Sequence, residues 1–248
     1  MKLSGNTILI TGGASGIGFA LAKRFAAAGS EVVVCGRRVE QLEEAKRLIP
    51  GLQTIAADVS TATGRQELAD QVKKKFPKLN VLINNAGVQN RPPSLDKSQN
   101  WDTHAQEIAI NLEAPMHLSM LILPLLLKQG RPSFLMNVSS GLAFLPLAFM
   151  PTYCATKAAL HSFTLSLRQQ LKSGTNVEVI EVIPPAVNTD LGGKGLHDFG
   201  IPLDEFADHA MAQIEKGELE FGYGFSEKGR LASRAQLDEM FSAMNRQS

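Results

Sequence analysis

The chain has 248 residues, 44% of them hydrophobic and 20% charged, which is the balance of an ordinary globular protein. Its 25 Lys and Arg residues against 24 Asp and Glu leave a formal net charge of +1 at pH 7. This charge gives no electrostatic footprint for nucleic acid or for an anionic membrane surface, so we expect neither as a partner.

The opening residues, MKLSGNTILITGG, carry one Lys and an apolar run that is too short for a signal peptide. The most apolar run, LILPLLL, is far below the length that spans a membrane. The two cysteines, Cys35 and Cys154, form neither a CxxC motif nor a four-ligand metal set. We therefore expect a soluble protein of the reducing cytoplasm.

Short apolar runs alternate with longer stretches of helical period. The runs predict strands at 7–10, 31–34, 52–57, 80–83, 133–138 and 177–183. The other stretches predict helices at 19–29, 39–49, 65–76, 101–128 and 152–171. Runs that are apolar throughout are typical of a parallel sheet covered on both faces. No linker, repeat or low-complexity tract divides the sequence, so we expect one α/β domain over residues 1–248.

A glycine-rich turn, TGGASGIG at 11–18, joins the first predicted strand to the first predicted helix. Backbone N–H groups and the positive helix end can face a pyrophosphate in such a turn. Its glycines, Gly12, Gly16 and Gly18, follow GxxxGxG and not GxGxxG, so a merely tight turn stays equally open on this motif alone.

The second predicted strand ends in EVVVCGRR. Gly36 stands where a carboxylate would bind a ribose 2′-hydroxyl, and Arg37 and Arg38 follow it. Arginine suits a 2′-phosphate, so the strand end favours NADP(H), with NAD(H) still possible. The alternative is two solvated arginines that open a helix, although cations there oppose the helix dipole.

Tyr153 and Lys157, in YCATK, lie four positions apart and share one face of a predicted helix. The pKa of a tyrosine is ordinarily about 10, and a neighbouring ammonium lowers it toward the neutral range. The pair can therefore move a proton, although the same spacing occurs by chance in many helices.

Several motifs together resemble the short-chain dehydrogenase/reductase family over residues 5 to 190: TGGASGIG, NNAG at 84–87, Asn111, NVSS at 137–140 and YCATK. The resemblance implies a doubly wound parallel sheet of the Rossmann type in three α/β/α layers, and a nicotinamide cofactor. It also implies a catalytic tetrad of Asn111, Ser140, Tyr153 and Lys157. IPPAVNTDL and LHDFGIPLDEFAD are similar to the DltE-type branch of this family.

The tetrad suits hydride transfer to a carbonyl, which leaves negative charge on the oxygen. Tyr153 would donate the proton and Ser140 a fixed hydrogen bond. Lys157 would bring the pKa of Tyr153 toward the neutral range and would contact the nicotinamide ribose. Asn111 would hold a water molecule that connects Lys157 to solvent.

The remaining cofactor contacts are implied by the resemblance. Asp58 and Val59 resemble adenine contacts, 85–87 the floor of the adenosine pocket, and Thr189 a carboxamide contact. The predicted cofactor-binding set is Gly12, Ser15, Gly16, Ile17, Gly18, Arg37, Arg38, Asp58, Val59, Asn85, Ala86, Gly87, Tyr153, Lys157, Val187 and Thr189. We expect no metal, because none of the five histidines has metal-ligand spacing with another ligand type.

Two stretches depart from the family pattern. Pro184 and Pro185 replace the usual Pro-Gly, and the second proline removes an N–H and stiffens the loop. The end of the chain lacks the usual Asp-Gly-Gly and predicts a strand within 219–225 and a helix at 234–244. We expect 191–216 to cover the substrate, although its residues, His197 included, show no decisive binding chemistry.

The sequence thus predicts an oxidoreductase that transfers a hydride between NADP(H) and a small carbonyl or secondary alcohol. The alternative is a catalytically weak, dinucleotide-responsive binding or regulatory protein on the same fold. A serine hydrolase is disfavoured because no GxSxG elbow occurs. The apolar helices around Ser140 predict a homodimer or homotetramer.

Overall fold

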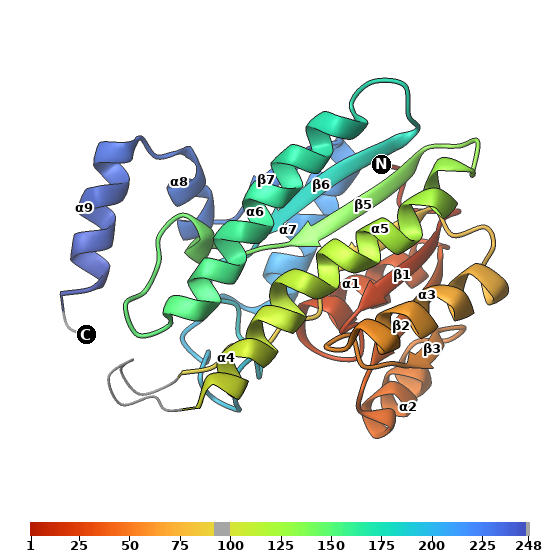
Figure 1. The fold of residues 1–248 in the computed structure, drawn as a ribbon, viewed down its shortest axis with the longest axis horizontal. Helices are drawn as coiled ribbons and strands as arrows, with labels where there is room; N and C mark the ends of the chain where they lie inside the picture. Colours follow the sequence, from red (N-terminus) through yellow and green to blue (C-terminus); the bar gives the residue numbers. More distant parts are fainter. Residues whose placement is uncertain (92–99, 247–248) are drawn as a thin grey trace.

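The apolar runs form one parallel sheet in the computed structural model, which describes residues 1–91 and 100–246 (Figure 1). The strand order is β3-β2-β1-β4-β5-β6-β7. The strands are β1 Thr7–Thr11, β2 Glu31–Gly36, β3 Gln53–Ala56, β4 Val81–Asn84, β5 Ser133–Val138, β6 Val177–Ile183 and β7 Glu220–Gly222. The predicted doubly wound, Rossmann-type α/β fold is confirmed.

Helices cover both faces of this sheet (Figure 1). They are α1 Gly16–Ala27, α2 Val39–Leu48, α3 Ala62–Lys75, α4 Trp101–Ile108, α5 Ala114–Leu127, α6 Pro151–Leu171, α7 Leu203–Lys216, α8 Phe225–Leu231 and α9 Arg234–Met244. A π-helical turn, η1 Ala109–Glu113, joins α4 to α5, and a short 3-10 helix, η2 Gly141–Ala143, follows β5.

The two faces of the sheet carry separate cores, which explains why its central strands are largely apolar. Ile8 and Ile10 of β1 pack with α1, α2 and α7, whereas Leu9 packs with α3, α5 and α6. Side chains alternate between the faces of a strand, so a sheet covered on both sides buries every position.

The region 191–216 has two parts. Residues of the segment 191–203 lie at the main cavity, whereas Phe206, Ala210 and Ile214 of α7 are fully buried in the core beside α1. At the end of the chain, the strand predicted within 219–225 is β7, and it stops at Gly222. The Gly222 N–H donates to the Glu227 carboxylate (2.7 Å), which turns the chain into α8.

The continuous helical segment Trp101–Leu127 is long and apolar enough to cross a membrane by length and composition alone. Its α5 part lies on the sheet against β4 and β5 and beside α3 (Figure 1). Leu118, Ile122 and Leu126 are buried there in the core. We therefore assign α5 to the core of the fold.

The sheet reverses its direction of growth at β1. The chain builds outward from β1 to β2 and β3, then crosses back to place β4 on the other side of β1. In doubly wound sheets, ligands bind beyond the carboxyl ends of the strands at such a reversal.

Candidate active site

A large cavity of about 1250 Å³ opens at this reversal point. It extends from the turn after β1 to the start of α6 and is lined on one side by the loop that follows β6. Within the part of the chain that the structure describes, all predicted site residues except Gly18 and Asn111 line this cavity. The lining members are Gly12, Ser15, Gly16, Ile17, Arg37, Arg38, Asp58, Val59, Asn85, Ala86, Gly87, Ser140, Tyr153, Lys157, Val187 and Thr189.

The glycine-rich turn is shaped by close packing. Gly12 has a φ of 63°, and a Cβ there would lie 2.9 Å from the Cα of Ala86. Asn85 clamps the turn, because its side-chain amide donates to the carbonyls of Thr11 (3.0 Å) and Gly12 (3.2 Å). A Cβ on Gly18 would collide with the same amide. Gly18 therefore permits close packing of α1 on this loop, while the other glycines leave the cavity wall open.

Arg37 and Arg38 at the end of β2 are exposed on the cavity wall, as a role toward an anionic ligand requires. Asp58 lies across from them. Burial acts to raise the pKa of Asp58, but hydrogen bonds from Ser60 and the charge of Arg37 outweigh it and lower the pKa. This end of the cavity therefore holds a carboxylate and two guanidinium groups.

Three of the four predicted catalytic residues meet at the other end of the cavity. Tyr153 and Lys157 on the first turns of α6 are buried, and the Lys157 Nζ lies 5.6 Å from the centroid of the Tyr153 ring. Ser140, which follows β5, lies near Tyr153 at the cavity, and its hydroxyl acts to lower the pKa of Tyr153. Lys157 Nζ donates to the carbonyl of Val138 (3.0 Å), which anchors it to the same strand.

Burial controls the protonation of this group. It raises the pKa of Tyr153 well above its ordinary value, and the Ser140 hydroxyl offsets only part of that rise. This direction is opposite to the one that the Tyr–Lys spacing predicts, because both groups lie in a dry site. Burial also lowers the pKa of Lys157 to about 8, against the opposing charges of Glu107 and Glu181.

Asn111 sits in the π-helical turn and binds backbone. Its side-chain oxygen accepts from the Val88 N–H (2.9 Å) and its amide donates to the Val88 carbonyl (2.8 Å). The Asn111 amide also donates a third hydrogen bond, to Thr156 Oγ1 (3.3 Å). Asn111 thus fixes the loop after β4 beside α6, a contact that the predicted water-holding role does not include. Single π turns inside α-helices are frequent at functional sites.

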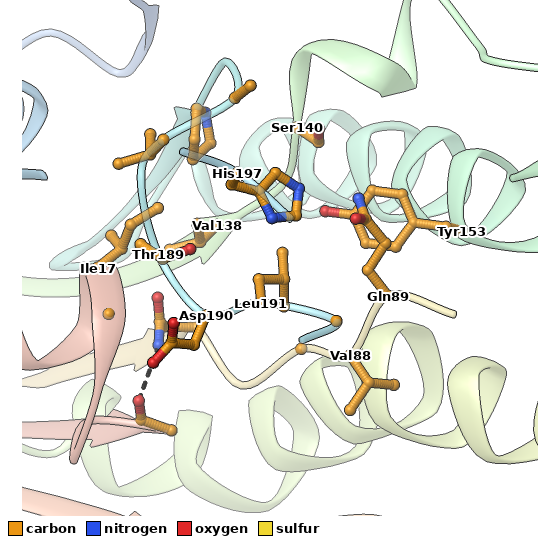
Figure 2. Close-up of a pocket in the computed structure, with 18 of the residues that line it drawn as sticks. Ile17, Val88, Gln89, Val138, Ser140, Tyr153, Thr189, Asp190, Leu191 and His197 are labelled. Atoms are coloured by element: carbon orange, nitrogen blue, oxygen red, sulfur yellow. Dashed lines mark hydrogen bonds between the residues drawn. The ribbon is translucent and has the colours of Figure 1, made fainter. Parts of the chain in front are cut away.

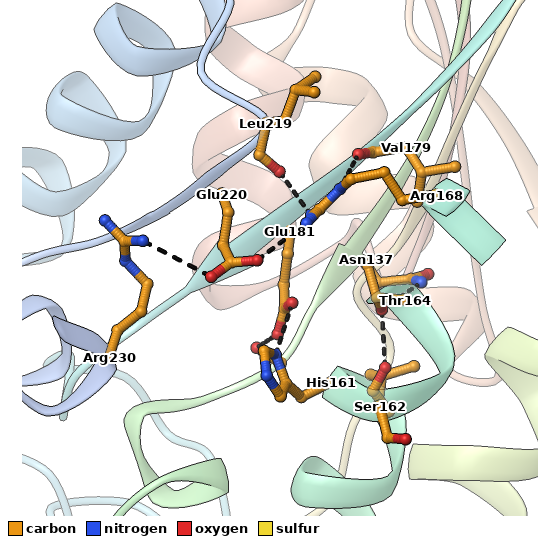
Figure 3. A network of polar contacts seen from close by, with 12 residues as sticks. Asn137, His161, Ser162, Thr164, Arg168, Val179, Glu181, Leu219, Glu220 and Arg230 are labelled. Atoms are coloured by element: carbon orange, nitrogen blue, oxygen red, sulfur yellow. Dashed lines mark hydrogen bonds and ion pairs between the residues drawn. The ribbon is translucent and has the colours of Figure 1, made fainter. Parts of the chain in front are cut away.

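A polar network joins side chains of α6, β6 and β7 (Figure 3). The fully buried carboxylate of Glu181 accepts from Ser139 Oγ (2.6 Å) and contacts His161 Nδ1 (2.8 Å). Ser139 precedes Ser140, and His161 follows Lys157 by one helical turn. The network therefore connects β5, α6 and β6 at the site.

The same network brings together a histidine and two carboxylates that sequence spacing did not pair. Ligand atoms of His161, Glu181 and Glu220 lie within 4.8 Å of one another. Glu220, however, accepts from Arg168 (2.9 Å) and pairs with Arg230 (3.5 Å). Two guanidinium groups disfavour a metal cation at this carboxylate, so the cluster is an ion-pair network.

Three buried polar residues at the site lacked a sequence signal: Gln89, Glu107 and His197. Glu107 accepts from the Asn90 N–H (2.9 Å), and burial raises its pKa. Gln89 and His197 line the cavity and point to the side where Tyr153 lies (Figure 2). None of them belongs to a recognisable motif, and their placement depends on loop packing.

Comparison with known proteins identifies relatives over the whole chain. The model of the short chain dehydrogenase family matches residues 6–198. The chain is 44% identical over 252 residues to the uncharacterized oxidoreductase DltE of Bacillus subtilis, covering 100% of this chain and 99% of that protein. It is 33% identical to sulfoacetaldehyde reductase 2 of Chromohalobacter salexigens, covering 74% of this chain and 73% of that protein.

Solved structures share the fold. A short chain dehydrogenase/reductase from Burkholderia phymatum, in complex with NAD, superposes with a TM-score of 0.84 at 20% identity, covering 99% of this chain and 97% of that one. A short-chain dehydrogenase from Sphingobium yanoikuyae, in complex with NADPH, gives a TM-score of 0.79 at 24% identity, covering 98% and 94%.

Proposed function

Since the chain belongs to the short-chain dehydrogenase/reductase family, we propose that it reduces a small carbonyl compound, or oxidises the matching secondary alcohol, with NADP(H) as cofactor. The observation that carries this proposal is the buried meeting of Ser140, Tyr153 and Lys157 at one end of the large cavity. The glycine-rich turn and the arginines lie along the same cavity, so one elongated ligand can reach both.

The cavity residues fit a dinucleotide. The backbone of the glycine turn at the start of α1 suits a pyrophosphate, and no Cβ at Gly12 would be tolerated against Ala86. Arg37 and Arg38 suit a 2′-phosphate. Thr189, which lies close to Gly16, would contact the carboxamide of the nicotinamide. When bound, the nicotinamide supplies or accepts the hydride.

The protein's own residues would handle the proton. At neutral pH the raised pKa keeps the Tyr153 hydroxyl protonated, so it can donate to a carbonyl oxygen that gains negative charge. Ser140 would donate a second hydrogen bond to that oxygen. Lys157, with its pKa near 8, still carries most of its charge at pH 7 and stabilises the phenolate that remains. This favours carbonyl reduction at neutral pH and alcohol oxidation at higher pH.

We also propose a reducing, cytoplasmic setting. Cys35 and Cys154 are both free and buried, and burial raises the pKa of the Cys35 thiol to about 12. Such thiols are poor nucleophiles and are suited to packing.

Tyr153→Phe tests the mechanism. Because phenylalanine preserves the packing and deletes the acid, we expect carbonyl reduction to fall by roughly 10²–10⁴-fold while the cofactor still binds. NADPH oxidation would be followed by absorbance against a panel of aldehydes and ketones, with cofactor affinity titrated separately. Tyr223→Phe is the matched control: Tyr223 also borders the cavity, but its hydroxyl bonds to Glu205 (2.6 Å) at an exposed position. Undiminished turnover in Tyr153→Phe would refute the assigned acid. Wild-type protein that binds NADPH but reduces nothing would instead favour the binding or regulatory alternative.

A further inference from the structure

Two residues that line the cavity each bury a side-chain polar atom that has no hydrogen-bond partner. Within residues 1–91 and 100–246, the buried side-chain atoms without a partner are Asn84 Oδ1, Gln89 Oε1 and His197 Nδ1. Asn84 lies in the interior, bonded to Ser119 and Asn137, whereas Gln89 and His197 line the cavity. Burying a polar atom unpaired is unfavourable, so a ligand that pairs with both atoms gains free energy.

The loop that carries Gln89 is held rigidly on both sides. Asn111 makes two hydrogen bonds to the backbone of Val88, at 2.9 and 2.8 Å. On the other side, Glu107 accepts from the Asn90 N–H (2.9 Å). Both anchors are buried side chains of the α4–η1 segment, so the backbone on either side of Gln89 is fixed before a ligand binds.

The loop that carries His197 packs directly on the first. A Cβ at Gly192 would lie 2.7 Å from the Gln89 carbonyl oxygen, so only glycine allows this approach. The Gly200 N–H donates to the His197 carbonyl (2.8 Å) and closes a turn around the histidine. Two irregular segments that are far apart in the sequence thus present their polar side chains to one space (Figure 2).

The surroundings of His197 favour the neutral form of its ring. Burial lowers the pKa of His197, and the nearby charge of Arg91 acts in the same direction, while a hydrogen bond to the Leu191 backbone opposes them. A neutral imidazole has one N–H and one lone pair, so the Nδ1 atom of His197, which has no partner, can either accept from or donate to a ligand hydroxyl. Gln89 offers a carbonyl oxygen beside it. A hydroxyl can donate to the Gln89 oxygen and can also pair with His197 Nδ1, whereas a carboxylate has no proton to donate to the Gln89 oxygen.

We propose that Gln89 and His197 bind a hydroxyl group next to the reacting carbonyl, so that the substrates are small hydroxyaldehydes and hydroxyketones. This inference rests on the proposed function, because Tyr153 and Ser140 are taken to hold the carbonyl oxygen. Gln89 and His197 are then specificity-determining residues. They would bind the hydroxyl on the carbon next to the carbonyl, whereas Tyr153 would transfer the proton.

A matched set of substrates tests the inference in the wild-type protein. Hydroxyacetone, butanone and pyruvate differ in one group next to the carbonyl: a hydroxyl, a methyl or a carboxylate oxygen pair. We expect kcat/KM for hydroxyacetone to exceed that for butanone by at least about tenfold, because a site with buried polar atoms rejects an analogue that leaves them unpaired. A preference for pyruvate, or equal use of hydroxyacetone and butanone, would overturn the inference and leave the proposed reaction standing. Failure to reduce any carbonyl would overturn both.

Three variants assign the selectivity to these residues. Gln89→Met and His197→Phe should bring the ratio of the hydroxyacetone to the butanone kcat/KM toward one by lowering the hydroxyacetone value, with butanone unchanged or improved. His197→Asn should restore part of the ratio, because its amide can pair with the hydroxyl in place of Nδ1. Gln53→Met, at an exposed position of β3, is the control and should keep the wild-type ratio. NADPH affinity reports folding in each case, and an unchanged ratio in variants that bind NADPH would overturn the assignment.

Discussion

At the scale of single residues, the carboxylate of Glu181 is fully buried in β6 yet doubly paired, by Ser139 and His161. Ser139 precedes Ser140 in the chain, and His161 lies one helical turn beyond Lys157 on α6. Since a buried carboxylate is stable only when paired, the two partners fix the spacing between β5 and α6. The residues proposed for catalysis therefore depend for their placement on a pair that lies beside them in the chain.

The pair also makes stability depend on pH. The hydrogen bond with Glu181 raises the pKa of His161; burial opposes it, the charges of Glu181 and Glu220 add to it, and Arg168 opposes it. The folded state therefore favours protonated His161. Its stabilising contribution is complete below about pH 6.5, the ordinary pKa of histidine, and is lost as the pH rises through the raised value.

His161→Gln tests this dependence. We expect the wild type to exceed the variant in free energy of unfolding most below about pH 6.5, with the difference shrinking as the pH rises through the raised pKa of His161. Urea unfolding at several pH values measures it. Ser162→Ala, the next residue on α6 and exposed, should show a difference that is constant with pH. A difference of constant size for His161→Gln would mean that the pair is not ionised.

At the scale of elements, the turn between β2 and α2 concentrates positive charge. Arg38 is the N-cap of α2, where the described structure shows no side-chain cap hydrogen bond, and Arg37 precedes it. Cations at a helix N-terminus interact unfavourably with the helix dipole. The negative charge of a bound 2′-phosphate would offset this repulsion. Gly36, at the end of β2, has room for a side chain, since a Cβ there would approach only Leu42, at 3.9 Å.

Cofactor choice can therefore be redirected at this turn. Gly36→Asp with Arg37→Ala should weaken NADPH and improve NADH, because the new carboxylate accepts from a 2′-hydroxyl and repels a phosphate. The lost charge-assisted bonds are worth roughly 1.5–3 kcal/mol, or about tenfold to over a hundredfold in affinity. Arg37→Ala alone should act less, because Arg38 compensates. Titration of both nucleotides measures the ratio, and Arg47→Ala on the exposed face of α2 should leave it as in the wild type. If the double variant keeps the wild-type ratio, the arginines are solvated surface and the NADP(H) preference is wrong.

At the scale of the whole molecule, the features that the sequence predicts are those set by local residue patterns. The strands and the glycine turn follow from apolar runs and fixed spacings, and the tetrad follows from the family resemblance. Gln89 and His197 could not be predicted, because their relation arises where loops 88–91 and 191–200 pack together. The direction of the Tyr153 pKa could not be predicted from the spacing either, because in the folded site burial raises this pKa by more than Ser140 lowers it.

The outer surface of α5 and α6 carries apolar side chains that the monomer leaves uncovered. Met120 is 69% exposed and Leu165 42% exposed, and the two helices lie next to each other on one face of the sheet (Figure 1). Exposed apolar patches of this kind mark interfaces, so we propose that the chain forms a homodimer or homotetramer through them.

Charge placed in that surface should separate the copies. We expect light scattering at micromolar concentration to give a dimeric or tetrameric mass for the wild type. Met120→Glu with Leu165→Glu should give a monomer with an unchanged circular dichroism spectrum, because like charges brought together across a symmetric interface lose their hydration and repel each other. Leu48→Glu on α2, where the side chain is 60% exposed, is the control and should keep the wild-type mass. A monomeric wild type would refute the assembly, and a double variant of wild-type mass would move the interface to another face of the molecule.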